Sequence, residues 1–205
     1  MTLKLCSICA ALALAFATGA QAQSTMSKDT AKADRPSAER KVKNAEEDRI
    51  EADAKAAKAK CETMKGNAKD VCEKEAKGKE KIAKADLEAQ YKNTDKARYD
   101  ARVAKADAQY DVAKEKCDDL KGNDKDVCVK EAKATHTKAK ADAKVARAEQ
   151  DQTMKTASKT QDARRDAAED KRDADYKVAK EKCDALSGAA KDKCVNDAKA
   201  RYGKT

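Results

Sequence analysis

The cysteines are the residues of this sequence whose type and spacing could do chemistry. Six of the eight form three pairs with one spacing, Cys-x10-Cys, at Cys61/Cys72, Cys117/Cys128 and Cys183/Cys194. A cysteine pair can bind a soft metal or exchange electrons as thiols, or it can close a structural disulfide. After residue 22 the sequence has neither a Cys-x2-Cys redox pair nor paired Cys-x2-4-Cys zinc ligands. The pattern favours three structural disulfides and leaves a thiol-based metal- or redox-responsive protein as an alternative.

Little else in the sequence resembles an active site. The only histidine, His136, excludes a His-based triad and a metal site of several histidines, and we expect it to be a solvated helix residue. Carboxylates alternate with lysines, which is typical of solvated helix faces rather than of a catalytic pair. Tyr110 and Tyr176 each precede a cysteine by seven residues, and we expect them to pack in helix seams rather than stack on nucleic-acid bases. We therefore predict no catalytic residue, no cofactor and no metal, and a protein that is not an enzyme.

The N-terminal segment reads as a cleavable signal peptide, residues 1–22. Lys4 gives a positive start, an apolar stretch follows from Leu5 to Ala20, and Ala20-Gln21-Ala22 is a small-x-small cleavage site. The apolar run is short of the roughly 20 residues that span a bilayer as a helix, although an uncleaved anchor is the alternative. Cys6 and Cys9 would leave with the signal, so the mature chain keeps an even number of cysteines in a compartment that permits disulfides. With its alanine- and lysine-rich style, the chain is predicted to be periplasmic.

The composition limits the size of any core. Charged residues make up 41% of the chain and aromatic residues 3%, a balance that is typical of disorder. The abundant Ala, Lys, Glu and Arg are, however, strong helix formers, and acid-to-base pairs four residues apart recur, such as Glu73–Lys77 and Asp126–Lys130. We therefore expect elongated helices joined along thin, alanine-rich seams.

A threefold repeat organises these helices. The copies are AKAKCETMKGNAKDVCEKEAK, AKEKCDDLKGNDKDVCVKEAK and AKEKCDALSGAAKDKCVNDAK, and each has a glycine five residues after its first cysteine, at Gly66, Gly122 and Gly188. If the chain reverses at this glycine, the two cysteines face each other across an antiparallel hairpin, with Asn67 or Asn123 able to cap the second helix. In one unbroken helix they would lie ~16 Å apart and could not bond. The predicted fold is all-α: elongated up-and-down helical hairpins, coiled-coil-like, with three stapled turns.

The predicted organisation has three parts. The signal peptide is followed by a flexible linker at 23–35 and by an elongated helical repeat region at 36–205, in which a helix could begin at Pro36. Long helical stretches are expected at 68–121 and 124–187. Weak breaks near residue 93 and at 153–160 leave open whether these stretches are continuous.

Two tracts, EAKGKEKIAKADLEAQ (75–90) and KAKADAKVARAE (138–149), resemble the lysine/alanine-rich helical middle region of TolA, a bacterial cell-envelope protein. TolA keeps an N-terminal membrane anchor and ends in a globular domain, whereas this chain is expected to lose a cleavable signal and to stop in helix. The repeat YKVAKEKCDALSGAAKDKC more closely resembles uncharacterised periplasmic proteins of beta-proteobacteria that are TolA-like in composition. The resemblance implies a helical envelope protein and brings no activity with it.

These features favour a non-enzymatic structural or interaction protein of the periplasm, acting as a spacer, scaffold or envelope-stress component. The net charge of +9 supports an alternative, a weak electrostatic binder of anionic envelope polymers, lipid headgroups or nucleic acid. Acidic residues interleave with the basic ones throughout, so nucleic acid is the less favoured partner. An envelope protein, an anionic polymer or a second copy of the chain, packed through coiled-coil seams, remains a candidate partner. No small-molecule substrate is expected.

Overall fold

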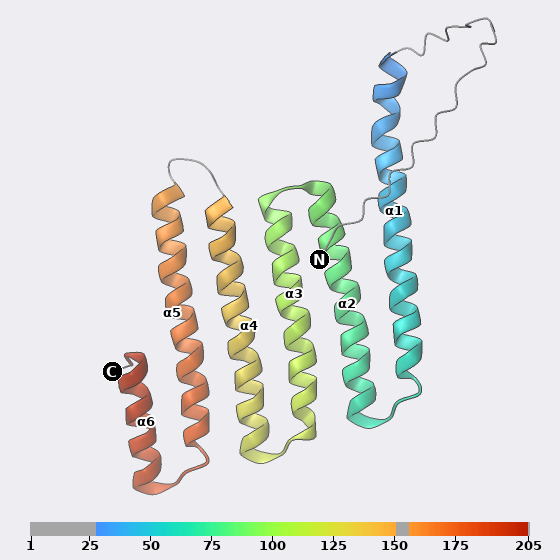
Figure 1. The fold of residues 1–205 in the computed structure, drawn as a ribbon. Helices are drawn as coiled ribbons and strands as arrows, with labels where there is room; N and C mark the ends of the chain where they lie inside the picture. The colour runs from blue at the N-terminus through green and yellow to red at the C-terminus, as the bar shows by residue number, and fades with distance from the viewer. Residues whose placement is uncertain (1–27, 151–155, 205) are drawn as a thin grey trace, which may run out of the picture. The chain divides into compact units, whose positions relative to one another are not determined.

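The computed structural model describes residues 28–150 and 156–204 (Figure 1). The predicted signal peptide and the first residues of the predicted linker lie outside this range. The chain divides into two units, residues 1–38 and 39–205. The helices are α1 (Lys28–Cys61), α2 (Gly66–Lys92), α3 (Asp95–Lys116), α4 (Gly122–Gln150), α5 (Thr156–Cys183) and α6 (Gly188–Tyr202), with a short 3-10 helix, η1 (Cys117–Asp119), after α3. No strand occurs in the described residues, and the all-α prediction is confirmed.

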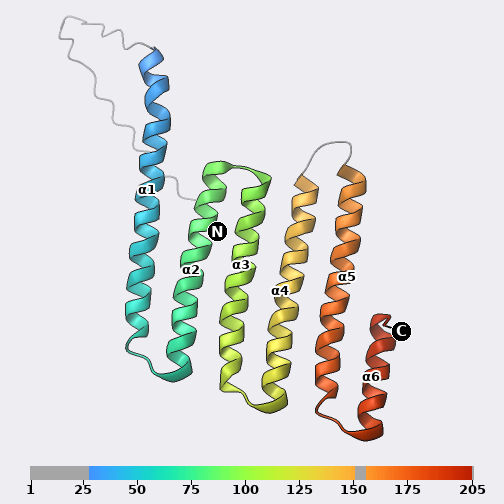
Figure 2. The same ribbon diagram turned by 180° about the vertical axis from the view of Figure 1, so that it is seen from behind.

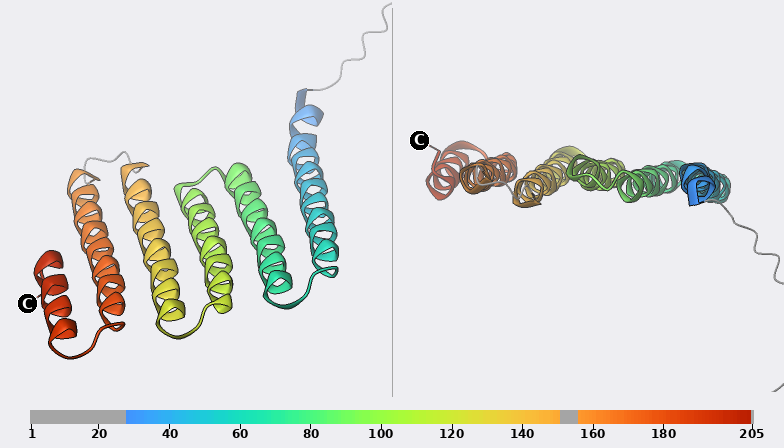
Figure 3. Two further views of the ribbon diagram at one scale, coloured as in Figure 1. Left: turned by 60° about the horizontal axis from the view of Figure 1, so that its bottom comes forward. Right: turned by 90° about the horizontal axis from the view of Figure 1, so that it is seen from above.

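Within residues 39–205 consecutive helices run in opposite directions (Figures 1 and 2). From α2 to α6 each helix packs against the next in the sequence, and α1 is joined to α2 by a disulfide and by ion pairs such as Lys58–Glu80. Seen from above, these helices lie side by side in a single layer (Figure 3). They form three hairpins: α1 with α2, α3 with α4, and α5 with α6. Since no second layer of described residues covers them, these helices have only narrow seams in which to bury side chains.

The seams are built almost wholly from alanine. Apart from Leu87 and one cysteine of each pair, every buried apolar side chain in the described residues is an alanine, for example Ala106, Ala141 and Ala167, and no described polar residue is buried as a whole. Alanine is the best helix former and its small side chain lets neighbouring helices approach closely. The expected thin alanine seam is confirmed, and the apolar burial that it supplies is small.

The long helical stretch expected at 68–121 is interrupted by a chain reversal. Asn93 takes the left-handed conformation, with φ +45°, and its N–H donates to Ala89 O at 3.0 Å, which ends α2. Thr94 is extended, and its Oγ1 accepts from Ala97 N at 3.2 Å, which starts α3. The stretch 124–187 is likewise two antiparallel helices, α4 and α5. The break expected at 153–160 falls in part on residues 151–155, which are outside the described residues.

Two helix starts differ from expectation. Helix α1 begins at Lys28, eight residues before Pro36, so residues 28–35 of the predicted linker are helical. The helix-forming residues of this segment favour the earlier start, and Pro36 then lies inside the helix, where its ring removes one backbone hydrogen bond. The predicted capping role of Asn67 is wrong. Because α2 already begins at Gly66, after an extended Lys65 with no side-chain cap, Asn67 lies inside the first turn, where its Nδ2 is buried without a hydrogen-bond partner.

Candidate functional site: the stapled turns

Each hairpin is closed by a disulfide next to its turn. The bonds Cys61–Cys72, Cys117–Cys128 and Cys183–Cys194 join Cα atoms 5.6, 5.7 and 5.7 Å apart, distances that are usual for disulfides. All three predicted pairings are therefore confirmed. We call the segments 61–72, 117–128 and 183–194 the stapled turns. The first cysteine of each is the most deeply buried residue of its turn, with 0–1% of its surface exposed.

The backbone of the three turns follows one pattern. The N–H three residues after the first cysteine donates to that cysteine's carbonyl oxygen, from Met64 to Cys61 at 2.9 Å, from Leu120 to Cys117 at 3.0 Å and from Leu186 to Cys183 at 3.0 Å. The predicted turn residues Gly66, Gly122 and Gly188 all have left-handed φ values, +56°, +55° and +55°. A left-handed residue beyond the helix end reverses the chain, and glycine adopts it without steric cost.

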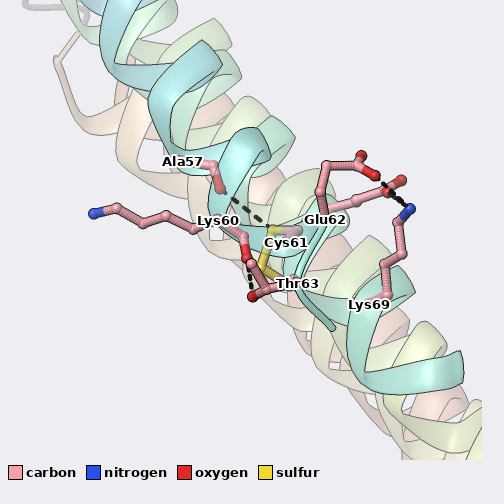
Figure 4. Close-up of a disulfide and its surroundings, with 8 residues drawn as sticks. Ala57, Lys60, Cys61, Glu62, Thr63 and Lys69 are labelled. Carbon is pink, nitrogen blue, oxygen red and sulfur yellow. Dashed lines mark hydrogen bonds and ion pairs between the residues drawn. A yellow bond between two sulfur atoms is a disulfide. The ribbon is translucent and has the colours of Figure 1, made fainter. Parts of the chain in front are cut away.

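The sulfur atoms of the first cysteines sit against the preceding helical turn. Cys61 Sγ lies 3.4 Å from Ala57 O, a contact drawn in Figure 4, and the equivalent distances are 3.2 Å from Cys117 to Ala113 and 3.3 Å from Cys183 to Ala179. A disulfide sulfur carries no proton, so these are packing contacts rather than hydrogen bonds. The backbone carbonyl oxygen makes each contact, and alanine stands at this position, four residues before the cysteine, in all three copies.

An ion pair spans each turn. The acid after the first cysteine pairs with the lysine seven residues further on: Glu62 with Lys69 at 2.8 Å (Figure 4), Asp118 with Lys125 at 2.8 Å and Asp184 with Lys191 at 2.7 Å. The hydrogen bonds from Lys125 and Lys191 lower the pKa of Asp118 and of Asp184. The sequence analysis missed these pairs, although the aligned repeats carry the signal, an acid and a lysine at fixed distances from each first cysteine.

Each turn also exposes one large apolar side chain at the same position. Met64, Leu120 and Leu186, three residues after the first cysteine, are 43%, 41% and 45% exposed. Their neighbours are charged or small, so the three side chains are separate spots rather than one apolar patch. Exposed apolar residues are common singly, but recurrence at one repeat position makes these three the clearest candidate contact points of the turns.

The tyrosines pack across their hairpins, as expected. Tyr110 stacks on His136, with ring centroids 4.9 Å apart, and Tyr176 meets Tyr202 edge-on at 6.4 Å in the equivalent place of the third hairpin. His136 is not the solvated residue that was expected, because its side chain is only 19% exposed and its Nε2 lies 2.5 Å from Asp107 Oδ1. Both the stacking tyrosine and the carboxylate come from α3. Sequence spacing alone does not predict that they lie next to His136 of α4.

The chemistry available at these turns is that of oxidised sulfur. The six cysteines of the described residues are all in disulfides and present no thiolate. No group of three or more His, Cys, Asp or Glu in the described ranges is arranged to hold a metal ion. The arrangement supplies mechanical connection between helices.

The fold and its turns define a class of protein: an all-α array of disulfide-stapled helical hairpins. Comparison with protein-family models, with curated proteins and with solved structures gives no match.

Proposed function

We propose that this chain is a non-enzymatic structural and interaction protein of the bacterial periplasm, a spacer, scaffold or envelope-stress component. The observation that carries the proposal is the threefold recurrence of one stapled turn, with the same disulfide, glycine, ion pair and exposed apolar residue. A repeated unit with a fixed backbone holds its surface positions at set intervals, which is what a spacer or scaffold requires. An array of single helices also leaves two faces open to partners.

The proposed location rests on the disulfides and on the N-terminal segment. Disulfides persist in oxidising compartments such as the periplasm and are rare in the cytosol. Within residues 28–150 and 156–204 no helix has the length and apolar character needed to cross a membrane. We propose export through the predicted signal peptide, with cleavage after Ala22.

The electrostatic alternative has less support. The net charge is +9, but many of the described lysines form ion pairs, within a hairpin at Lys58–Glu80 and between hairpins at Lys81–Asp111 and Lys144–Asp170. A surface of paired charges presents no concentrated basic patch to a polyanion, so binding to an anionic resin is expected to be weak and lost at modest salt. The thiol-based alternative needs reduced cysteines, and in this structure all six described ones are oxidised.

In-cell cross-linking tests the scaffold proposal. A photoreactive residue replaces Leu120, which is exposed in the second turn, and the chain is expressed in a Gram-negative host and illuminated. A scaffold is expected to give discrete adducts with other envelope molecules, and to lose them when Cys117→Ser and Cys128→Ser open the turn. Illumination that yields no adduct with any other molecule, at Leu120 or at the equivalent Met64 and Leu186, would contradict the proposal.

A further inference from the structure

The three hairpins are joined by contacts that repeat with one register. Lys116, just before the first cysteine of the second turn, pairs with Glu75 of α2 at 3.0 Å, and Lys182, in the same position of the third turn, pairs with Glu131 of α4 at 2.6 Å. Both glutamates stand three residues after the second cysteine of the preceding turn. The second hairpin therefore packs on the first in the same register as the third hairpin packs on the second.

Two further contacts recur at equivalent positions of the two interfaces between hairpins. Small residues meet at the close approach: a Cβ on Gly78 would lie 3.1 Å from Ala108 Cβ, and the equivalent pair is Ala134 and Ala174, which are 7% and 6% exposed. A second ion pair joins Lys74 to Glu115 at 3.6 Å, and its equivalent joins Lys130 to Glu181 at 3.0 Å. We call this set of contacts the inter-hairpin seam: one ion pair, a small-residue approach and a second ion pair.

The two outer helices of the unit are α1 and α6. Each carries the residues of one side of this seam, and no described helix packs against those residues. On α6, Asp197 takes the place of Glu75 and Glu131, and Ala200 takes the place of Gly78 and Ala134. On α1, Lys60 takes the place of Lys116 and Lys182, and Ala52 takes the place of Ala108 and Ala174. These four residues are exposed. An acid and an alanine on α6 thus match a lysine and an alanine on α1.

The second ion pair is missing from both halves at once. Asn196 stands where α2 and α4 have Lys74 and Lys130, and Ala59 stands where α3 and α5 have Glu115 and Glu181. If only one partner were lost, a contact built on this register would leave a charge facing an uncharged residue. Loss of both keeps the two edges complementary in charge.

From this register we infer that α6 of one copy packs against α1 of a second copy, antiparallel, through the same contacts as the inter-hairpin seam. Asp197 then pairs with Lys60 of the next copy, and Ala200 meets its Ala52. In the described structure Asp197 accepts from Lys193 at 2.6 Å, and its second carboxylate oxygen remains able to take another donor. The contact is heterologous, so it propagates into open chains rather than closing a dimer.

This inference rests on the proposed scaffold function, since it names a second copy as the scaffold's partner. Helix α6 has 15 residues, compared with 27 in α2 and 29 in α4, so the contact between copies is shorter than either inter-hairpin seam. The chains are therefore expected to form reversibly and to lengthen with protein concentration.

Analytical ultracentrifugation of the full exported chain, in its oxidised form, tests the inference. The average mass is expected to rise with concentration. Asp197→Lys and Lys60→Glu should each weaken association at least about tenfold, because each places like charges at the contact. Mixing the two variants, or combining both changes in one chain, restores opposite charges and should restore association. The control variant is Asp119→Lys in the second turn, which changes the net charge by the same amount as Asp197→Lys. It should leave association unchanged.

A chain that stays monomeric at every concentration would overturn the inference, as would association that neither variant weakens. Circular dichroism and the disulfide map establish that each variant is folded, so loss of the fold is not mistaken for loss of the contact. The scaffold proposal is judged separately, because adducts with other envelope molecules do not depend on contact between copies.

Discussion

At the scale of single residues, each stapled turn depends on a backbone conformation that favours glycine. Gly122 has φ +55°, and no atom lies within 4 Å of the position that a Cβ would take. A side chain there meets no neighbour, so its only cost is the left-handed backbone itself. Cysteine spacing and the glycine were enough to predict this turn, because all of its determinants lie within twelve consecutive residues.

Replacing this glycine therefore measures the free-energy cost of the left-handed backbone alone. Gly122→Ala is expected to lower the free energy of unfolding by about 1 kcal/mol, the cost of an L-residue in the left-handed region. Gly122→Asn should cost less, because asparagine tolerates that region better. Urea titration of the oxidised variants measures both changes. Equal stability of the alanine variant and the parent chain would show that this residue does not need a positive φ.

The ion pairs of the turns make stability depend on pH at both extremes. Hydrogen bonds from lysines lower the pKa of Asp118 and of Asp184 from their ordinary value of 3.8, so their contribution is complete above that value and is lost as the pH falls through the folded pKa. Hydrogen bonds to acids raise the pKa of Lys69 and of Lys125 above 10.5, so their contribution is lost as the pH rises beyond it.

We therefore expect the melting temperature to be highest between these limits and to fall below pH 4 and above pH 10.5. The acid loss should be smaller in Asp118→Asn, which has no carboxylate to protonate at that position. Circular dichroism melts across the pH range measure both effects. Since the pairs are exposed, their contribution is modest and salt should reduce it. An identical acid loss in the variant and the parent would rule out the Asp118 pair as a source.

At the scale of elements, the disulfides compensate for seams that bury little apolar surface. Seams of alanine supply a small part of the apolar burial that usually holds helices together, so closing each turn covalently matters more here than in a protein with a large core. Composition predicted the thin seams correctly. It did not predict which helices meet between hairpins, because that choice depends on pairs such as Lys116–Glu75, which lie 41 residues apart in a sequence where lysines and acidic residues recur along every helix.

Removing one disulfide tests this balance. The double change Cys117→Ser and Cys128→Ser is expected to lower the free energy of unfolding by about 2–3 kcal/mol, the chain-entropy value for a loop of this length. Urea titration of the variant against the parent gives the difference. A difference near zero would mean that the alanine seam between α3 and α4 holds that hairpin closed without its disulfide.

The third hairpin should depend most on its disulfide. Helix α6 has one described neighbour, α5, and is the shortest of the described α-helices, so few other contacts hold it in place. In Cys183→Ser with Cys194→Ser, amide hydrogen exchange in α6 is expected to become faster than in α2 and α4. The matched control is the Cys117/Cys128 variant, in which α4 keeps α5 as a second neighbour. Equal protection of α6 in parent and variant would contradict this ranking of the three turns.

At the scale of the whole molecule, the proposed scaffold function follows from repetition. The hairpin module occurs three times, and local contacts hold its turn. Ion pairs between hairpins position the neighbouring module, and the residues for one such pair also occur on the outer helices. The local part was predictable because spacing and residue type determine it. The reversal at Asn93 and Thr94 was left open, because two weak cap residues in a helix-forming sequence do not decide between a kink and a turn. The second unit's self-complementary edges became visible only once the register was known.

The most direct test of the stapled array is peptide mapping of the unreduced protein isolated from the cells that produce it, with its N-terminus and every cysteine linkage assigned. We predict a chain that begins at Gln23 and has three local linkages, Cys61–Cys72, Cys117–Cys128 and Cys183–Cys194. Free thiols, or linkages between different repeats, would contradict the stapled array and favour the thiol-based metal or redox function instead.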